Sequence, residues 1–291
     1  YYLLKYEEKI INEHSVDMIS GGPPCQAYSL AGRIRDKNGM KDDYRNFLFE
    51  SYIRLVDYYK PKIVLFENVE GMLSAIPTGE KITELIRKGF DDIGYEIIND
   101  LRKYALLDLT KFGVPQKRER IIILGFNKDY LPENFKEFIF PKGNFDEKIS
   151  LGKILEKDVN EIYTISDKLW QGHKRRKEEH KRKGNGFGYS LFNENSKYTN
   201  TLTARYYKDG SEILIEQKNK NPRKLTPREC ARLQGFPEEF IIPVSNTSAY
   251  KQFGNSVCIP VIEAVAKSMI EYLEKYKILT LDFHLQFERN D

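Results

Sequence analysis

The 291-residue sequence has little cysteine, histidine or tryptophan and no long apolar run. The three cysteines, Cys25, Cys230 and Cys258, lie far apart and form no CxxC pair, which argues against a disulfide framework and a cysteine-rich zinc site. No stretch approaches the roughly 18 apolar residues of a membrane span. The opening residues also lack the charged-then-apolar order of a signal peptide. We therefore expect a protein of a reducing, cytoplasmic compartment.

Apolar and charged residues are both plentiful. Hydrophobic residues make up 40% of the chain and aromatic residues 13%, which is enough for a packed core and excludes global disorder. The length fits one large domain or two ordinary ones. The formal net charge of +4 permits a polyanionic partner without requiring one.

Short apolar runs alternate with helical patterns over the first 130 residues. The runs predict strands, and the i, i+3, i+4 spacing of apolar residues predicts helices. Strands are expected at 16–20, 63–66, 95–107 and 121–126, and helices at 46–59 and 80–88. This alternation favours an α/β domain with a largely parallel sheet.

The composition changes after about residue 130. Residues 128–183 are polar, and seven Lys or Arg crowd into 173–183. Residues 198–215 have the β-branched and aromatic content of strands, and 248–276 are expected to form one long helix. A second, smaller domain is therefore predicted in the middle of the chain.

Two candidate reactive side chains follow predicted strands. Cys25 lies in a loop stiffened by two prolines directly after the first strand, where α/β sheets bind ligands. It is a candidate nucleophile, although a lone cysteine is more often a small buried hydrophobe. Glu67 ends the second strand and is a candidate acid, with a solvated loop carboxylate as the alternative.

Two further segments carry candidate polar groups. Arg118 and Arg120 precede a strand, where their guanidinium groups either mark a charged strand entrance or bind a phosphate or base carbonyl. Asn255 and Ser256 precede the expected last helix and are also ordinary helix-capping residues. Each of these signals is weak when it is taken alone.

Five segments taken in order are much more specific. GGPPCQAYS, ENV, QKRER, RKLTPRECARLQGFP and AYKQFGNSV together resemble the motifs of the cytosine-C5 DNA methyltransferase family. The resemblance covers most of 15–130 and 223–270. It implies a doubly wound, Rossmann-like methyltransferase sheet that uses S-adenosylmethionine and no metal, with a target-recognition region in the variable middle.

The resemblance also implies roles for individual residues. Cys25 would add to C6 of cytosine, Glu67 would bind and protonate N3, Arg120 would hold O2, and Arg118 would help to order the site. The residues implied for DNA contacts are Ser29, Thr201 and Leu202, and those implied for the cofactor are Pro24, Leu48, Asn255 and Ser256. The motif at 223–237 is expected to brace the smaller domain rather than touch the base.

The sequence departs from the family pattern at its start. No FxGxG motif precedes residue 15, and residue 1 is Tyr rather than Met. We therefore expect an N-terminally truncated piece that alone binds S-adenosylmethionine poorly. The expected domains are an incomplete catalytic domain at 1–130, a target-recognition domain at 131–248 and a C-terminal segment at 249–291 that returns to the catalytic domain.

Two alternatives stay open at this point. The chain is either an active methyltransferase of duplex DNA, or a non-catalytic or split-subunit DNA-binding component. The tRNA-directed branch of the same family is a third possibility, although about 90 residues of variable sequence favour DNA reading. The resemblance further implies a prokaryotic or phage restriction-modification setting, with a possible cognate restriction endonuclease as partner.

Overall fold

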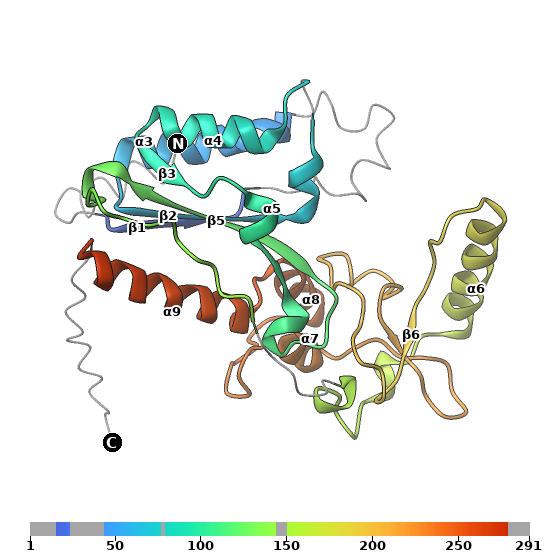
Figure 1. Ribbon diagram of the computed structural model, residues 1–291. Coiled ribbons are helices and arrows are strands. Elements are labelled where there is room, and N and C mark those ends of the chain that lie inside the picture. Colours follow the sequence, from blue (N-terminus) through green and yellow to red (C-terminus); the bar gives the residue numbers. More distant parts are fainter. Residues whose placement is uncertain (1–15, 24–43, 77–78, 144–149, 279–291) are drawn as a thin grey trace, which may run out of the picture. The chain divides into compact units, whose positions relative to one another are not determined.

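The computed structural model describes residues 16–23, 44–76, 79–143 and 150–278 (Figure 1). The expectations for Pro24, Cys25 and Ser29 lie outside these ranges. The chain forms two compact units. Unit 1 comprises Tyr1–Leu107, Glu119–Pro141 and Ala266–Asp291, and unit 2 comprises Asp108–Arg118 and Lys142–Val265.

Unit 1 is built on a five-stranded sheet. The strands are β1 (Met18–Gly21), β2 (Ile63–Val69), β3 (Tyr95–Ile97), β4 (Leu106–Asp108) and β5 (Glu119–Asn127). Their order is β1-β2-β5-β3, with β4 also paired to β5. Strands β1 and β2 are parallel, whereas β5 runs antiparallel to both β2 and β3. The sheet is thus mixed rather than largely parallel, because an apolar run predicts a buried strand but not its direction.

Helices cover both faces of this sheet (Figure 1). Helices α3 (Leu48–Tyr59) and α4 (Ile82–Asp92) lie on one face, and the part of α9 (Ile259–Tyr276) from Ala266 onward lies on the other. Helix α3 buries Phe49, Tyr52, Ile53 and Val56, which share one side at helical spacing. The Tyr52 hydroxyl lies 2.9 Å from the carbonyl oxygen of Ile19 and 3.0 Å from that of Leu65, so α3 is tied to β1 and β2.

Two local expectations for unit 1 need correction. The segment 95–107 is not continuous strand, since the short helix α5 (Leu101–Tyr104) separates β3 from β4. Asp100 caps α5 by accepting a hydrogen bond from the backbone nitrogen of Lys103 at 2.9 Å. Strand β2 is longer than expected and includes Glu67 and Asn68, so Glu67 belongs to the strand rather than to a loop.

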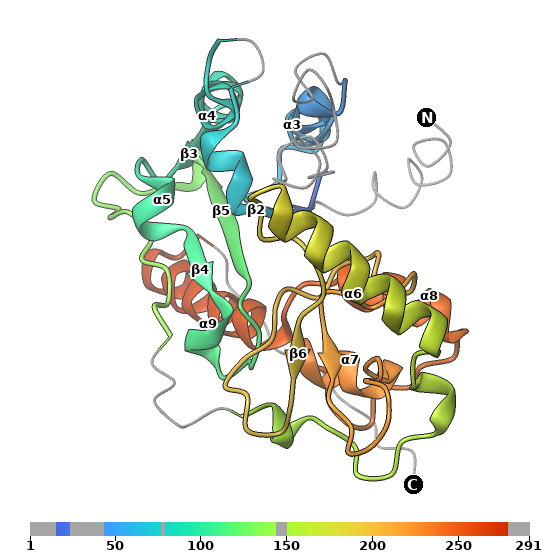
Figure 2. The same cartoon turned by 90° about the vertical axis from the view of Figure 1, so that its right-hand side faces the viewer.

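Unit 2 contains little regular strand (Figure 2). Its elements are α6 (Asp167–Arg182), β6 (Leu191–Phe192), β7 (Leu214–Ile215), α7 (Pro227–Leu233), α8 (Asn246–Asn255) and the start of α9. The 3₁₀ helices of the chain are η1 (Tyr44–Phe47), η2 (Glu70–Ser74), η3 (Leu109–Phe112), η4 (Lys128–Tyr130), η5 (Leu151–Lys153) and η6 (Glu161–Tyr163). The expectation of strands over 198–215 is wrong except for β7. The aromatic residues there pack into a core instead, where Tyr206 is fully buried.

The expected long helix over 248–276 is two helices. Helix α8 ends at Asn255 and α9 begins at Ile259, with Ser256 as the C-cap of α8. Pro260 explains the break. In a continuous helix, the backbone N–H of residue 260 would donate to the carbonyl of Ser256, but proline has no N–H. That carbonyl accepts from Arg118 Nη2 at 3.1 Å instead. Within the described ranges, no helix is long and apolar enough to cross a membrane.

Candidate active site

Glu67 and Arg120 form an ion pair across two strands of unit 1. Arg120 Nε lies 3.0 Å from Glu67 Oε1, and the side chains are 16% and 21% exposed, respectively. Val69 pairs with Arg120 and Glu67 pairs with Ile122, so both charged side chains project from the same face of the sheet. The pair is therefore partly withdrawn from water and fixed by the β2–β5 register.

The segment that leads to Cys25 lies against this pair. Gly22 follows β1, and a Cβ at this position would lie 3.3 Å from Glu67 Oε2. The Asn68 amide donates to the carbonyl of Pro23 at 3.1 Å, and its Oδ1 accepts from the backbone nitrogen of Val69 at 2.9 Å. Asn68 is buried, so the backbone two residues before Cys25 is anchored to the end of β2.

Asn68 was missed as a functional residue by the sequence reasoning. Its signal was its place in the ENV segment, directly after the candidate acid. The structure gives it a definite task, because it anchors the backbone at Pro23, two residues before Cys25 in the sequence.

The two described cysteines are poor nucleophiles. Burial is the main cause that raises the pKa of the Cys258 thiol to about 11, and it raises the pKa of Cys230 well above the ordinary value. Both thiols are therefore protonated near neutral pH, whereas nucleophilic attack requires a thiolate. This leaves Cys25 as the candidate nucleophile of the chain.

Arg118 occupies a buried position in unit 2. Its Nη1 donates to the carbonyl of Leu202 at 2.8 Å and lies 3.5 Å from that of Gly254, and its Nη2 donates to the carbonyl of Ser256 at 3.1 Å. Arg118 thus connects the Thr-Leu segment with the end of α8. This geometry supports an ordering role for Arg118.

Gln116 joins the same arrangement and was also missed. Its side-chain oxygen accepts from the backbone nitrogen of Leu202 at 2.8 Å, and its amide donates to the carbonyl of Leu233 at 3.1 Å. Thr201 donates to the carbonyl of Lys117 at 2.7 Å, so two of the three residues predicted to contact DNA, Thr201 and Leu202, are held on the QKRER segment. Leu202 itself is fully buried, which suits a packing role.

The described residues expected at the cofactor differ in exposure. Leu48 begins α3 and is half-buried, in unit 1. In unit 2, Asn255 is exposed at the end of α8, while the Ser256 hydroxyl donates to the carbonyl of Phe253 at 2.8 Å. No cluster of three potential metal ligands occurs within the described part of the chain.

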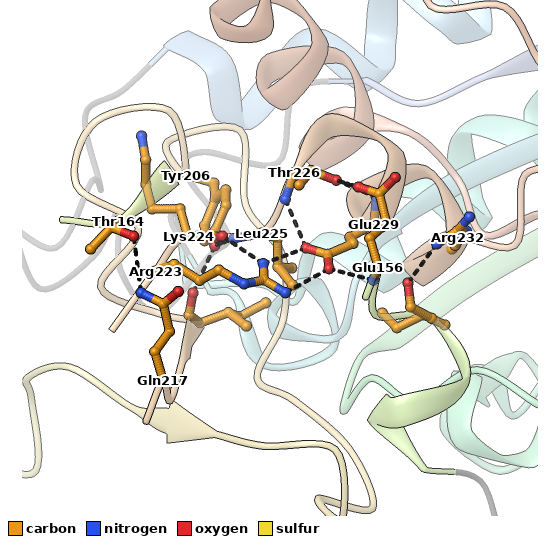
Figure 3. A network of polar contacts seen from close by, with 12 residues as sticks. Glu156, Thr164, Tyr206, Gln217, Arg223, Lys224, Leu225, Thr226, Glu229 and Arg232 are labelled. Carbon is orange, nitrogen blue, oxygen red and sulfur yellow. Dashed lines mark hydrogen bonds and ion pairs between the residues drawn. The ribbon is translucent and has the colours of Figure 1, made fainter. Parts of the chain in front are cut away.

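The motif at 223–237 forms a buried polar network (Figure 3). Arg223 makes two bonds to the Glu229 carboxylate, Nη1 to Oε2 at 2.7 Å and Nη2 to Oε1 at 2.8 Å. Glu229 also accepts from the backbone nitrogens of Glu156 and Thr226, each at 2.8 Å. Thr226 closes a capping box at the start of α7. These contacts lie within unit 2, which confirms the expected bracing.

Solved structures with similar folds are methyltransferases. The Entamoeba histolytica methyltransferase EhMeth has a TM-score of 0.65 and 21% identity, over 92% of this chain and 79% of that one. A mutant of Spodoptera frugiperda DNMT2 has a TM-score of 0.66 and 22% identity, over 90% of this chain and 82% of that one. The chain therefore shares the fold of these proteins.

Sequence comparison defines the family. The family described as C-5 cytosine-specific DNA methylase matches residues 4–271, and the chain belongs to it. Type II methyltransferase M1.ScrFI of Lactococcus lactis subsp. cremoris is 52% identical over 94% of this chain and 67% of its own length. Type II methyltransferase M.SsoII of Shigella sonnei is 49% identical over 94% of this chain and 68% of its own length.

Proposed function

We propose that this chain methylates C5 of cytosine in duplex DNA through a covalent bond between Cys25 and C6 of the base. The observation that carries the proposal is the Glu67–Arg120 pair beside the Gly22–Pro23 backbone, two residues before Cys25. This places an acid and a fixed positive charge next to the segment that bears the candidate nucleophile.

The difficulty of the reaction explains why these groups are needed. Cytosine C5 is a poor nucleophile, and addition of the Cys25 thiolate to C6 turns the ring into an enamine that is reactive at C5. Glu67 binds N3 and, once its carboxylate has taken up a proton from solvent, passes that proton to N3, so that negative charge does not accumulate on the ring. Arg120 orients the Glu67 carboxylate and holds the base oxygen O2. After C5 has taken the methyl group, water accepts the C5 proton, the C5–H electron pair re-forms the C5=C6 double bond, and the Cys25 thiolate leaves C6.

S-Adenosylmethionine supplies the methyl group when it is bound. Pro24, Leu48, Asn255 and Ser256 are the residues proposed to hold it. Of the described ones, Leu48 offers apolar surface and Asn255 an exposed amide.

The target base must leave the duplex before these groups can reach it. Extrusion costs a few kcal/mol of stacking and pairing, which contacts to the DNA backbone must offset. Ser29 and Thr201 are proposed to make such contacts. The hydroxyl of Thr201 donates to the carbonyl of Lys117, so a phosphate contact requires it to exchange this bond, because a phosphate oxygen only accepts.

Type II methyltransferases are the named relatives, and we propose that this chain protects a specific DNA site in the same way. A restriction endonuclease that cuts the same site is the partner this role implies.

Covalent trapping tests the proposal directly. The protein is incubated with S-adenosylmethionine and a DNA pool that contains 5-fluorocytosine. Fluorine cannot leave as a cation, so a working enzyme stalls as a denaturation-resistant adduct. We expect this adduct with wild type and with Cys258→Ser, and none with Cys25→Ser.

Two results would contradict the proposal. An adduct that persists in Cys25→Ser assigns the nucleophile to another residue. No adduct on any DNA by a well-folded wild-type protein supports the non-catalytic reading instead.

A further inference from the structure

Helix α6 holds an unusual share of the positive charge. Residues Asp167–Arg182 contain seven Lys or Arg and three Asp or Glu, so this helix alone carries a formal charge of +4. The whole chain also has a net charge of +4, so all other residues together are neutral. A surface with this excess attracts polyanions.

One side of α6 is fixed to unit 2. His173 is buried, and its Nε2 lies 3.3 Å from the carbonyl oxygen of Asp209. Arg176 donates to His173 Nδ1 at 2.9 Å and pairs with the Asp209 carboxylate at 3.3 Å. At the start of the helix, the Asn221 amide donates to Asp167 Oδ1 at 2.6 Å. The helix is thus held at its start and its middle.

Aromatic rings contact two lysines at the side of α6. Lys177 Nζ lies 4.2 Å from the ring centroid of Tyr189 and donates to its carbonyl at 3.1 Å. Lys174 Nζ lies 4.9 Å from the ring centroid of Trp170. These contacts restrict two long side chains without neutralising their charge.

The outer side of α6 carries a regular row of cations. Lys168, Arg175 and Arg182 are exposed and seven residues apart, so they lie on one side of the helix at intervals of about 10.5 Å. Within the described residues, Lys168 and Arg182 form no ion pair. Arg175 meets only the exposed Glu179 at 3.8 Å, a weak i, i+4 contact.

Helix α6 contacts unit 2 along one side but lies apart from the other helices of that unit. Figure 1 shows α6 separated from the other helices of unit 2, α7 and α8. His173 is its only fully buried residue. Between the cations, the outer side bears Gln171, Gly172, Glu178 and Glu179 and no apolar residue, which excludes the wide apolar side of a membrane-surface helix.

We propose that the row Lys168, Arg175 and Arg182 binds the phosphate backbone of duplex DNA. The inference rests on the proposed function, since it assigns a docking surface for the same DNA. The spacing of about 10.5 Å is close to the roughly 12 Å width of the major groove, so neighbouring members can reach phosphates on its two edges. Such contacts bind every sequence and position the protein without specifying the site.

Salt dependence of DNA binding tests the inference. The variant Lys168→Gln, Arg175→Gln, Arg182→Gln removes the row, and Gln has a helix propensity similar to that of Lys and Arg. The matched control Lys81→Gln, Lys88→Gln, Lys275→Gln removes the same charge from exposed positions of unit 1. Fluorescence anisotropy with a 30-base-pair duplex is measured between 50 and 200 mM salt, after circular dichroism confirms folding.

Each phosphate contact contributes about 0.9 to the slope of log K against log salt. Three lost contacts lower the slope by about 2.7, so across this range wild type loses roughly 40-fold more affinity than the row variant. The control variant should keep the wild-type slope. The gain variant Glu178→Gln, Glu179→Gln should bind DNA more tightly than wild type at low salt.

Equal slopes for wild type and the row variant overturn the inference. An equal decrease of the slope in the row variant and in the control variant overturns it as well. Trapping on 5-fluorocytosine DNA separates the role of α6 in DNA binding from the proposed methyl-transfer reaction. A wild-type adduct with unchanged slopes refutes only the role of α6. A changed slope without any adduct refutes the proposed reaction but keeps α6 as a DNA-binding surface.

Discussion

Burial should decide the strength of two ion pairs that are otherwise alike. Arg223–Glu229 and Arg232–Glu238 both join an arginine to a glutamate six residues later through two hydrogen bonds. Glu229 is fully buried, whereas the Glu238 side chain is 59% exposed. Glu229→Gln and Glu238→Gln therefore make the same chemical change in two environments, and each serves as the control of the other.

The magnitude for Glu229→Gln follows from its four contacts. Each carboxylate oxygen accepts one bond from Arg223 and one from a backbone nitrogen, at Glu156 for Oε1 and at Thr226 for Oε2. Whichever way the new amide turns, its NH₂ group faces two donors and leaves a buried guanidinium without a counter-charge. Breaking a buried pair in this way costs about 3–5 kcal/mol of the free energy of unfolding.

Urea denaturation gives the measurement. Trp170 is the only tryptophan and lies in unit 2, so its fluorescence reports the unit that contains both pairs. We expect Glu229→Gln to lose at least about 3 kcal/mol, more than a hundredfold in the unfolding equilibrium constant. Glu238→Gln should shift the midpoint only slightly, because water replaces the lost partner. Equal losses in the two variants would refute the argument from burial.

Three further predictions follow from single contacts. Glu67→Gln should lower the rate of methyl transfer at least about 100-fold and leave the affinity for DNA unchanged, because the acid that protonates the base is lost. The rate is measured with tritiated S-adenosylmethionine, and a decrease below tenfold contradicts the prediction. Gly254→Ala places a Cβ 2.3 Å from the carbonyl carbon of Thr203, so the free energy of unfolding should fall by about 1–3 kcal/mol. Urea denaturation measures this loss, and an unchanged midpoint rules out the clash. Burial is the main cause that lowers the pKa of His173 below 6.5. As the pH falls, the unfolded state therefore binds the proton before the folded state does, and stability falls below about pH 6.5. The melting temperatures at pH 7.5 and 5.5 should differ less in His173→Gln than in wild type, and an equal difference would show that His173 is not responsible.

The sequence was a good guide to the catalytic elements of unit 1. The motif order identified the family, and the apolar runs located β1, β2 and β5 within a few residues. The same runs could not give the direction of β5, since a strand buried on both faces has the same composition in either orientation. The proposed roles of the site residues remain predictions, although Glu67 and Arg120 do lie together.

The sequence was a poor guide to unit 2. Residues 198–215 have a strand-like composition, yet Tyr206 directs its hydroxyl to the carbonyl of Ile213 and accepts from the nitrogen of Leu225, which builds a core from turns. The break between α8 and α9 had a local signal in Pro260. The partner of the freed Ser256 carbonyl, Arg118, lies 138 residues away and had none.

The sequence by itself determined which chemistry this protein can perform, because reactive side chains in a fixed order are a local and readable property. Only the tertiary structure decided how those side chains are used. It separated Arg118, whose guanidinium donates to backbone carbonyls of Leu202 and Ser256, from Arg120, which pairs with Glu67. It also gave Asn68 and Gln116 their anchoring tasks. Hydrogen bonds between residues tens to more than a hundred positions apart form only after the chain has folded, so no local pattern encodes them.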